Sequence, residues 1–444
     1  MPHPAAVALT CGMNRSVKLL LILAASTAVA HAQSGAADPA FQKIPFDQWL
    51  GERSQPHFRW TAGVSRPELS FHQRFIAQVE VKLDGRDLES RRGEGRLVFF
   101  LQITDHDGNR YQDHGSIELS KLSDNLKSIN LEYVQRMFIL PGEYRLAVAV
   151  LDTNTGDHST TQSQFRVPPP QRESLPGAWR DLPPVEFIPN DESVEGWYLP
   201  DVKGRLHWAS TVQSATRLNV VLNVALSAPI PGTRLKRGND LSALLPTLKA
   251  ISQTGTPALS EHVELLDLSR RRAVFQQDEV RELDFPRLKE SLAVATTASI
   301  DLSSLSERHH DAQFFVSQIR RIIRASEKSC TLVVLTPSVA FEPGEDLDPI
   351  ALEALPPCRV FYIRYREQTK LVFRRFEPEF AGRRRGPPRE PQYGNHQQTA
   401  PDQLAATLKP LNPKIFDVET PDQMARALAE VEKALRTASE APPR

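Results

Sequence analysis

The sequence has only three cysteines and carries no net charge. Each of these features limits the classes of protein to which the chain can belong. Lysine plus arginine and aspartate plus glutamate each number 54 among 444 residues, so overall charge does not direct the chain to nucleic acid or to an anionic membrane. Glycine (21) is outnumbered by proline (35), which favours turns, edge strands and stiff linkers over long helical arrays. No repeat with a period of about 20–50 residues occurs, which argues against a solenoid or a propeller.

Motifs for catalysis and nucleotide binding are also missing. The chain has no G-x-S-x-G, H-E-x-x-H, P-loop or G-x-G-x-x-G motif with the flanking elements that each requires. Scattered serine, histidine and aspartate residues carry no signal without such a motif, so we assign no catalytic residue. We expect a protein that is not an enzyme and needs no cofactor. The alternative is an extracytoplasmic hydrolase or carbohydrate-binding factor that uses a cleft between domains.

Long apolar runs are rare, and the one that stands out lies at the N-terminus. Arg15 and Lys18 precede the apolar residues 19–30, and Ala30-His31-Ala32 supplies a small-x-small cleavage pattern. The run is too short to span a bilayer comfortably, and no second run of about eighteen apolar residues follows. We therefore expect residues 1–32 to be a signal peptide. The mature chain would then be exported, periplasmic or extracellular, and without a membrane span.

Between residues 57 and 167 the pattern predicts one strand after another. Residues 74–84 alternate polar and apolar side chains with a period of two, and several further short runs follow with turn signals between them. Such a series predicts an antiparallel β-sandwich, with residues 33–56 as an N-terminal extension. Residues 140–150 resemble the turn and strand of immunoglobulin-like and fibronectin-like domains, in which a tyrosine, here Tyr144, packs at a corner.

A proline-rich stretch follows the predicted sandwich. Proline removes a backbone donor and fixes φ, so we predict that residues 168–204 form a stiff linker and mark a domain boundary. The prolines that carry this prediction are Pro168, Pro169, Pro170, Pro176, Pro183, Pro184 and Pro189.

Residues 205–438 change to strands and helices in alternation, which predicts an open, mostly parallel sheet with helices on both faces. Residues 377–401 are polar and rich in proline and arginine, and we predict a flexible surface insertion there, with residues 439–444 as a tail. The predicted strands are residues 218–226, 331–338, 359–365 and 414–419, with a strand pair at 262–277, and the predicted helices are 240–253, 284–294, 311–326 and 420–436.

From Arg217 to Thr437 this order of elements resembles the von Willebrand factor A domain, and the two-part chain resembles secreted bacterial proteins in which that domain follows a β-rich module. The family holds a metal ion with D-x-S-x-S at the end of its first strand. Here the motif falls on residues 223–227, so that Asn223 replaces the aspartate, Ala225 replaces the first serine, and Ser227 remains. The family's later threonine and aspartate correspond to Thr336 and the Pro337-Ser338 that follows it.

The resemblance implies a scaffold that has lost its metal site. An amide and a lone hydroxyl give a hydrated Mg²⁺ little reason to shed water, so we expect no metal and a non-catalytic role in binding or scaffolding a protein partner. Ligands of open α/β sheets bind beyond the carboxyl ends of the strands. We therefore take Asn223, Ser227, Thr336 and Ser338 as candidate binding residues. Nothing in the sequence sets the oligomeric state.

Two short polar motifs have competing interpretations. Residues 105–109 (DHDGN) suggest a calcium loop, but Gly108 is fourth and not sixth, and a hairpin turn suits Asp107-Gly108 better. His309 and His310 are adjacent, and neighbours on a helix point about 100° apart, so a polar first turn suits them better than a shared metal.

A third motif, residues 359–390, mixes basic and aromatic residues as single-stranded nucleic-acid binders do. Its aromatic residues fall in or beside a predicted strand, so core packing and a solvated basic loop explain the composition. We expect no nucleic-acid partner.

Of the three cysteines, Cys11 leaves with the signal peptide, and Cys330 and Cys358 remain. Each immediately precedes a predicted strand, and in the fold that the chain resembles these two parallel strands are neighbours. The resemblance thus implies a disulfide between Cys330 and Cys358, which an oxidising compartment permits. The alternative is two small buried thiols that never meet.

Overall fold

The computed structural model describes two compact parts of the chain, and the predicted signal peptide, insertion and last four tail residues lie outside the described residues. The structure describes residues 38–52, 59–91, 93–122, 130–170, 174–175, 177–189, 199, 202–207, 217–224, 240–253, 260–297, 310–326, 330–337, 350, 355–366 and 402–440. One unit comprises Met1–Pro67, Ala77–Pro169 and Pro183–Phe187, and the other comprises Glu68–Ile76, Pro170–Leu182 and Ile188–Arg444.

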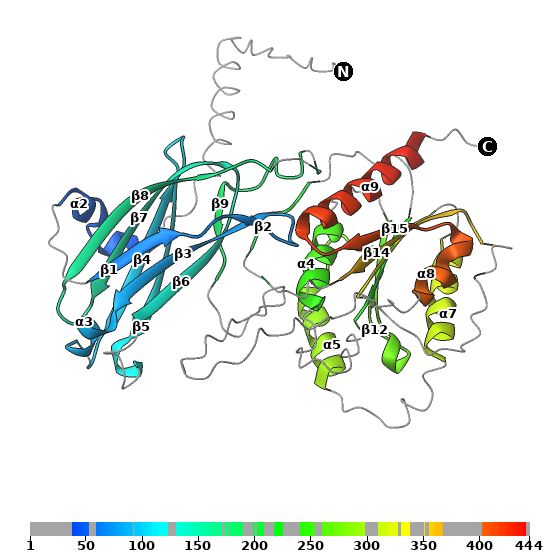
Figure 1. The fold of residues 1–444 in the computed structure, drawn as a ribbon, viewed down its shortest axis with the longest axis horizontal. Coiled ribbons are helices and arrows are strands. Elements are labelled where there is room, and N and C mark those ends of the chain that lie inside the picture. Colours follow the sequence, from blue (N-terminus) through cyan, green and yellow to red (C-terminus); the bar gives the residue numbers. More distant parts are fainter. Residues whose placement is uncertain are drawn as a thin grey trace, which may run out of the picture. The chain divides into compact units, whose positions relative to one another are not determined.

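The first unit consists mainly of two antiparallel β-sheets, as the alternating pattern predicts (Figure 1). Strand β2 and the first two residues of β3 belong to one of these sheets but cluster with the second unit. One sheet has the order β1-β3-β6-β9, with β2 beside β3, and the other has the order β5-β4-β7-β8. The strands of the first sheet are β1 (Trp60–Val64), β2 (Glu68–Leu69), β3 (Phe75–Asp84), β6 (Asn130–Ile139) and β9 (Val185–Phe187). Those of the second are β4 (Arg96–Thr104), β5 (Arg110–Glu118), β7 (Gly142–Asp152) and β8 (His158–Val167).

Aromatic side chains fill the space between these sheets. Phe99 of β4 and Tyr133 of β6 stack with ring centroids 4.3 Å apart. Tyr144 is buried, and its hydroxyl donates a hydrogen bond to the carbonyl oxygen of Leu140 at 2.9 Å, which satisfies its polar end. The corner packing that the sequence predicts for Tyr144 is therefore present.

The sequence analysis missed two parts of this unit. The N-terminal segment forms η1 (Phe41–Lys43) and α2 (Phe46–Gly51), and its aromatic side chains pack on Phe100 and on Ala147 and Ala149 of the second sheet. Strand β9 falls inside the range predicted as a linker and pairs antiparallel with β6, because the residues after Pro184 alternate and extend. The described part of the unit also contains two short helical turns, α3 (Gly85–Glu89) and η2 (Leu119–Lys121).

The second unit contains a six-stranded sheet in the order β12-β11-β10-β13-β14-β15. All its neighbouring strands are parallel except β12, which pairs antiparallel with β11 at one edge. The central strands are almost wholly buried, as their continuous apolar runs predict. The strands are β10 (Arg217–Asn223), β11 (Ser260–Asp267), β12 (Arg272–Gln277), β13 (Cys330–Pro337), β14 (Cys358–Tyr365) and β15 (Lys414–Val418).

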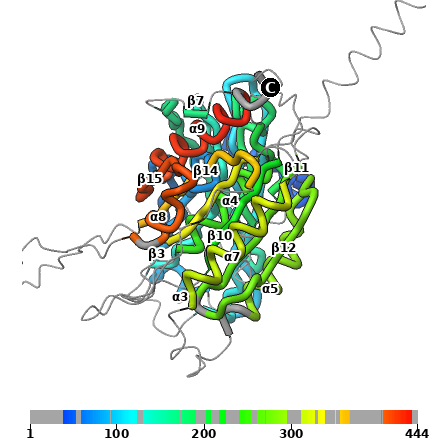
Figure 2. The backbone as a smooth tube through the Cα atoms, turned by 90° about the vertical axis from the view of Figure 1, so that its right-hand side faces the viewer, coloured from blue at the N-terminus to red at the C-terminus, as the bar shows by residue number. Residues whose placement is uncertain are grey.

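Helices cover both faces of this sheet (Figure 1). Helices α7 (Asp311–Arg324) and α8 (Gln403–Leu408) pack on one face, which Figure 2 shows from the front. Helices α4 (Asp240–Ser252), α5 (Phe285–Thr297) and α9 (Pro421–Glu440) lie on the other. Two 3₁₀ turns, η4 (Leu268–Arg270) and η6 (Lys409–Leu411), join elements at the edges.

Helix α9 shows how the local sequence sets a helix start. The side chain of Gln423 accepts a hydrogen bond from the Thr420 backbone N–H at 3.1 Å, and the Gln423 N–H returns one to the Thr420 hydroxyl at 3.4 Å. Met424, Leu428, Val431 and Leu435 recur at helical spacing, and the stripe that they form is buried. Within the described part of the chain, no helix combines the length and apolar character needed to cross a membrane.

Candidate functional site

Two of the predicted binding residues meet at the carboxyl edge of the six-stranded sheet. Asn223 ends β10, and Thr336 follows Leu335, which pairs with Leu222 on the neighbouring strands β13 and β10. The Asn223 amide Nδ2 donates a hydrogen bond to the Thr336 hydroxyl oxygen at 3.2 Å, and that hydroxyl donates to the carbonyl of Pro337 at 2.8 Å. Both side chains are buried. The Thr336 hydroxyl is therefore satisfied as both acceptor and donor inside the protein.

The partners of this pair limit its chemistry. The described ends of β10 and β13, residues 223–224 and 336–337, include no carboxylate. An amide nitrogen and a hydroxyl bonded to each other do not form the anionic oxygen set that Mg²⁺ prefers. Ser227 and Ser338, the other two candidates, lie outside the described residues, so the structure neither gathers nor separates them.

The next strand adds an ion-pair cluster at the same edge. Arg364 of β14 contacts Asp402, the N-cap residue of α8, and also lies 2.8 Å from the carboxylate of Asp417 on β15. Arg366 pairs with the same Asp417 at 3.1 Å. Burial alone would lower the pKa of Arg364, but the two carboxylates more than offset it and hold the pKa above its ordinary value. These charges are matched two against two.

A charged network around the buried side chains of His262 and Glu264 links β11 to α7, and the sequence analysis did not predict it. His262 Nδ1 is 2.8 Å from the carboxylate of Asp278, and its Nε2 is 3.3 Å from Glu264. Glu264, with 0% exposure, also pairs with Arg321 of α7. Burial would raise the pKa of Asp278, but its hydrogen bonds and charge interactions, of which the hydrogen bond to His262 is the largest, together outweigh burial, so the pKa lies below its ordinary value. No sequence signal joins these residues, because Arg321 of α7 lies more than forty residues after Asp278.

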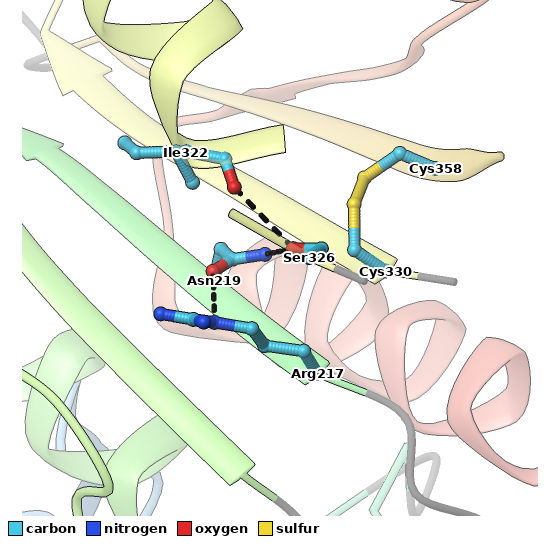
Figure 3. Close-up of a disulfide and its surroundings, with 6 residues drawn as sticks. All are labelled: Arg217, Asn219, Ile322, Ser326, Cys330 and Cys358. Carbon is cyan, nitrogen blue, oxygen red and sulfur yellow. Dashed lines mark hydrogen bonds between the residues drawn. A yellow bond between two sulfur atoms is a disulfide. The ribbon is translucent and has the colours of Figure 1, made fainter. Parts of the chain in front are cut away.

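The amino edge of the same sheet carries the predicted disulfide, which the structure confirms. Cys330 and Cys358 are in register on β13 and β14, with Cα atoms 4.5 Å apart. Figure 3 shows a polar chain on the neighbouring strand, in which Arg217 donates to Asn219 at 3.2 Å and Asn219 donates to Ser326 at 3.2 Å. The two edges of the sheet therefore differ. A disulfide links two strands at the amino edge, and the Asn223–Thr336 hydrogen bond links two strands at the carboxyl edge.

The structure decides one of the competing motif interpretations. Residues 105–109 form the turn between β4 and β5, where Asp105 accepts hydrogen bonds from the backbone N–H groups of Asp107 and Asn109. The turn prediction is confirmed. His310 precedes α7 and its ring lies 3.3 Å from the Gln313 side chain, whereas His309 lies outside the described residues. Of the basic segment, Tyr362 and Tyr365 are buried in β14, as core packing predicts.

Comparisons with known proteins add little. No family model matches the chain, and no curated protein matches it. Among solved structures, a Bordetella pertussis protein provisionally named ApaA is 16% identical over 26% of this chain and 97% of its own, with a TM-score of 0.18. A structural genomics target is 14% identical over 26% of this chain and 90% of its own, also with a TM-score of 0.18. These values are too low to support an argument about fold or function.

Proposed function

We propose that this chain is an exported, non-catalytic protein that binds or scaffolds a protein partner through a metal-independent domain of the von Willebrand factor A type. The six-stranded sheet, with a single antiparallel edge strand and helices on both faces, is the arrangement that this resemblance implies. The β-sandwich in the first unit fits the two-module organisation. The disulfide fits an oxidising compartment.

The observation that carries the proposal is the Asn223–Thr336 hydrogen bond. In a metal-dependent domain of this type, a carboxylate at position 223 would hold the ion that a ligand completes. Here the amide bonds to the neighbouring strand instead, at a buried position. Recognition would then rest on side chains of the loops that follow β10 and β13, since loops on a rigid sheet commonly carry binding.

Those two loops carry opposite charge in the sequence. The segment after β10 includes Arg234, Lys236 and Arg237, and the segment after β13 includes Glu345 and Asp346. A partner that binds both segments would therefore contact charged groups of both signs. Reversing one of these charges would disrupt the electrostatic complementarity between the partner and this chain.

Charge reversal tests the proposal. The partner is first captured by crosslinking to the wild-type mature protein in the native envelope and identified by mass spectrometry. Lys236→Glu and Glu345→Lys should each weaken binding of that partner by about tenfold or more, since charge reversal at an interface costs more than 1 kcal/mol. Lys121→Glu, at a 75% exposed side chain of the first unit, is the control and should bind normally. The reverse pattern would place binding in the β-sandwich and contradict the proposal.

A further inference from the structure

Three potential metal ligands converge in the first unit, whereas the edge discussed above belongs to the second unit. Asp38 precedes η1 in the N-terminal segment, and Asp113 and His114 lie on the edge strand β5. One ligand atom from each side chain lies within 4.8 Å of the other two. His114 Nδ1 is in direct contact with the Asp38 carboxylate. The contact joins residues 76 positions apart, so it is set by the fold and not by local sequence.

The chemistry of this set favours one class of ion. An imidazole nitrogen together with two carboxylate oxygens suits Zn²⁺ and similar first-row divalent ions, which bind such ligands at about 2.0–2.2 Å. Ca²⁺ and Mg²⁺ prefer more oxygen ligands and no imidazole. Ligand atoms within 4.8 Å of one another need only a small contraction to surround one ion.

The electrostatics of the cluster point the same way. The backbone N–H of His114 donates a hydrogen bond to the Asp113 carboxylate at 2.9 Å, which holds the two neighbouring side chains in place. Two carboxylates held this close repel each other when both are ionised, and a divalent cation removes that repulsion. The Asp38 side chain is only 13% exposed, whereas that of His114 is 43% exposed and leaves the cluster open to solvent.

Around the cluster, the N-terminal segment is packed on the second sheet. Phe41 packs edge-on against Phe46 at 4.8 Å and against Phe100 of β4 at 5.2 Å. Trp49 of α2 stacks on His158 of β8 with ring centroids 4.2 Å apart. An ion held between Asp38 and β5 would fasten the start of this segment, and the aromatic contacts fasten the remainder.

We propose that Asp38, Asp113 and His114 bind a divalent transition-metal ion, with Zn²⁺ as the best match, and that the ion fastens the N-terminal segment to strand β5. The site is independent of the carboxyl edge of the second unit and stands whether or not that edge binds a partner. Its role is structural, since the ion joins two distant parts of one unit.

Calorimetric titration of the chelator-treated mature protein with ZnSO₄ tests the site. Wild type should bind one equivalent that His114→Ala and Asp113→Asn each weaken by about 100-fold, because each removes a direct ligand. His106→Ala is the matched control, since His106 lies on the adjoining turn, is 74% exposed and contacts Asp107 in a similar way. It should bind as wild type does. Circular dichroism verifies that each variant folds. If His114→Ala does not fold, Asp113→Asn is used as the test variant instead.

A second readout reports on the segment itself. Lys43 is exposed in η1, so trypsin cleavage after it follows local opening of the N-terminal segment. Zn²⁺ at about 100 times its Kd should slow this cleavage by roughly 10- to 100-fold in wild type and in His106→Ala, and not in His114→Ala. The proposal is overturned if wild type binds no Zn²⁺, if His114→Ala binds it as tightly, or if cleavage is equally fast with and without the ion.

Discussion

At the scale of single residues, the sequence identified the two candidates that the structure describes but not their bond. The apolar runs in the sequence indicate where two strands end, and Asn223 and Thr336 lie at those ends. Their hydrogen bond, like the contacts of Glu264 with Arg321 and of Asp38 with His114, depends on which strands and helices pack together. A single sequence carries no signal for such pairings.

The Asn223 amide should not tolerate a charge. We expect Asn223→Asp to lower the free energy of unfolding by about 2–4 kcal/mol at neutral pH, because the new carboxylate is buried and replaces the amide that donates to the Thr336 hydroxyl. Asn219→Asp on the same strand is the matched control. Asn219 is equally buried but accepts from Arg217 Nε at 3.2 Å, so its carboxylate gains a partner and costs less. Denaturant midpoints that rank the two variants the other way would contradict this.

Glu261 should make stability depend on pH. It is 2% exposed, its Oε1 has no partner among the described residues, and burial raises its pKa to about 8. The folded protein therefore holds a proton that the unfolded chain releases above its ordinary pKa, 4.5. The stabilising effect is full below pH 4.5 and falls by up to about 1.4 kcal/mol per pH unit as the pH rises toward 8.

Comparing two variants isolates this effect. Glu261→Gln keeps the buried shape without the ionisable proton. Its free energy of unfolding should therefore not fall as the pH rises from 4.5 to 8, and at pH 8 it should exceed the wild-type value. Glu282→Gln, at a 69% exposed side chain, should follow the wild-type curve. Parallel curves for wild type and Glu261→Gln from pH 4.5 to 8 would show that Glu261 ionises normally in the folded protein.

At the scale of elements, strands and helices with a clear period were predicted well, and short elements held by distant partners were not. The closing helix α9 has its start written locally in Thr420 and Gln423. Strand β9 and helix α2 have only three and six residues and gain their stability from β6 and from the second sheet. Short segments of this kind do not form alone, so local patterns underestimate them.

The bridge between β13 and β14 gives the element-scale prediction. Labelling of the denatured, unreduced mature protein should find no reactive thiol, because Cys330 and Cys358 are joined. Cys330→Ser/Cys358→Ser should lose about 3–4 kcal/mol of stability, as expected for a closed loop with a sequence separation of 28 residues. Two labelled thiols per chain would refute the bridge.

At the scale of the whole molecule, the composition and the periodicity of apolar residues predicted two kinds of architecture in one chain. The change from a period of two to alternating strands and helices separates the antiparallel sheets from the mostly parallel one. Residues 68–76 cluster with the second unit, and no sequence pattern indicates that assignment. The sequence could not predict a unit boundary at residues 68–76, because that boundary depends on tertiary packing. The proline content indicates only where the backbone is locally stiff.

Titration of the mature protein with Mg²⁺, followed by thermal unfolding, tests most directly whether the second unit is metal-independent. His114→Ala is measured in parallel to remove any contribution of the first unit. The Asn223–Thr336 pair predicts that about 10 mM Mg²⁺ leaves the melting temperature of both proteins unchanged. Saturable stabilisation of both by about 4 kcal/mol, which an ion at 1,000 times its Kd would give, would contradict the account.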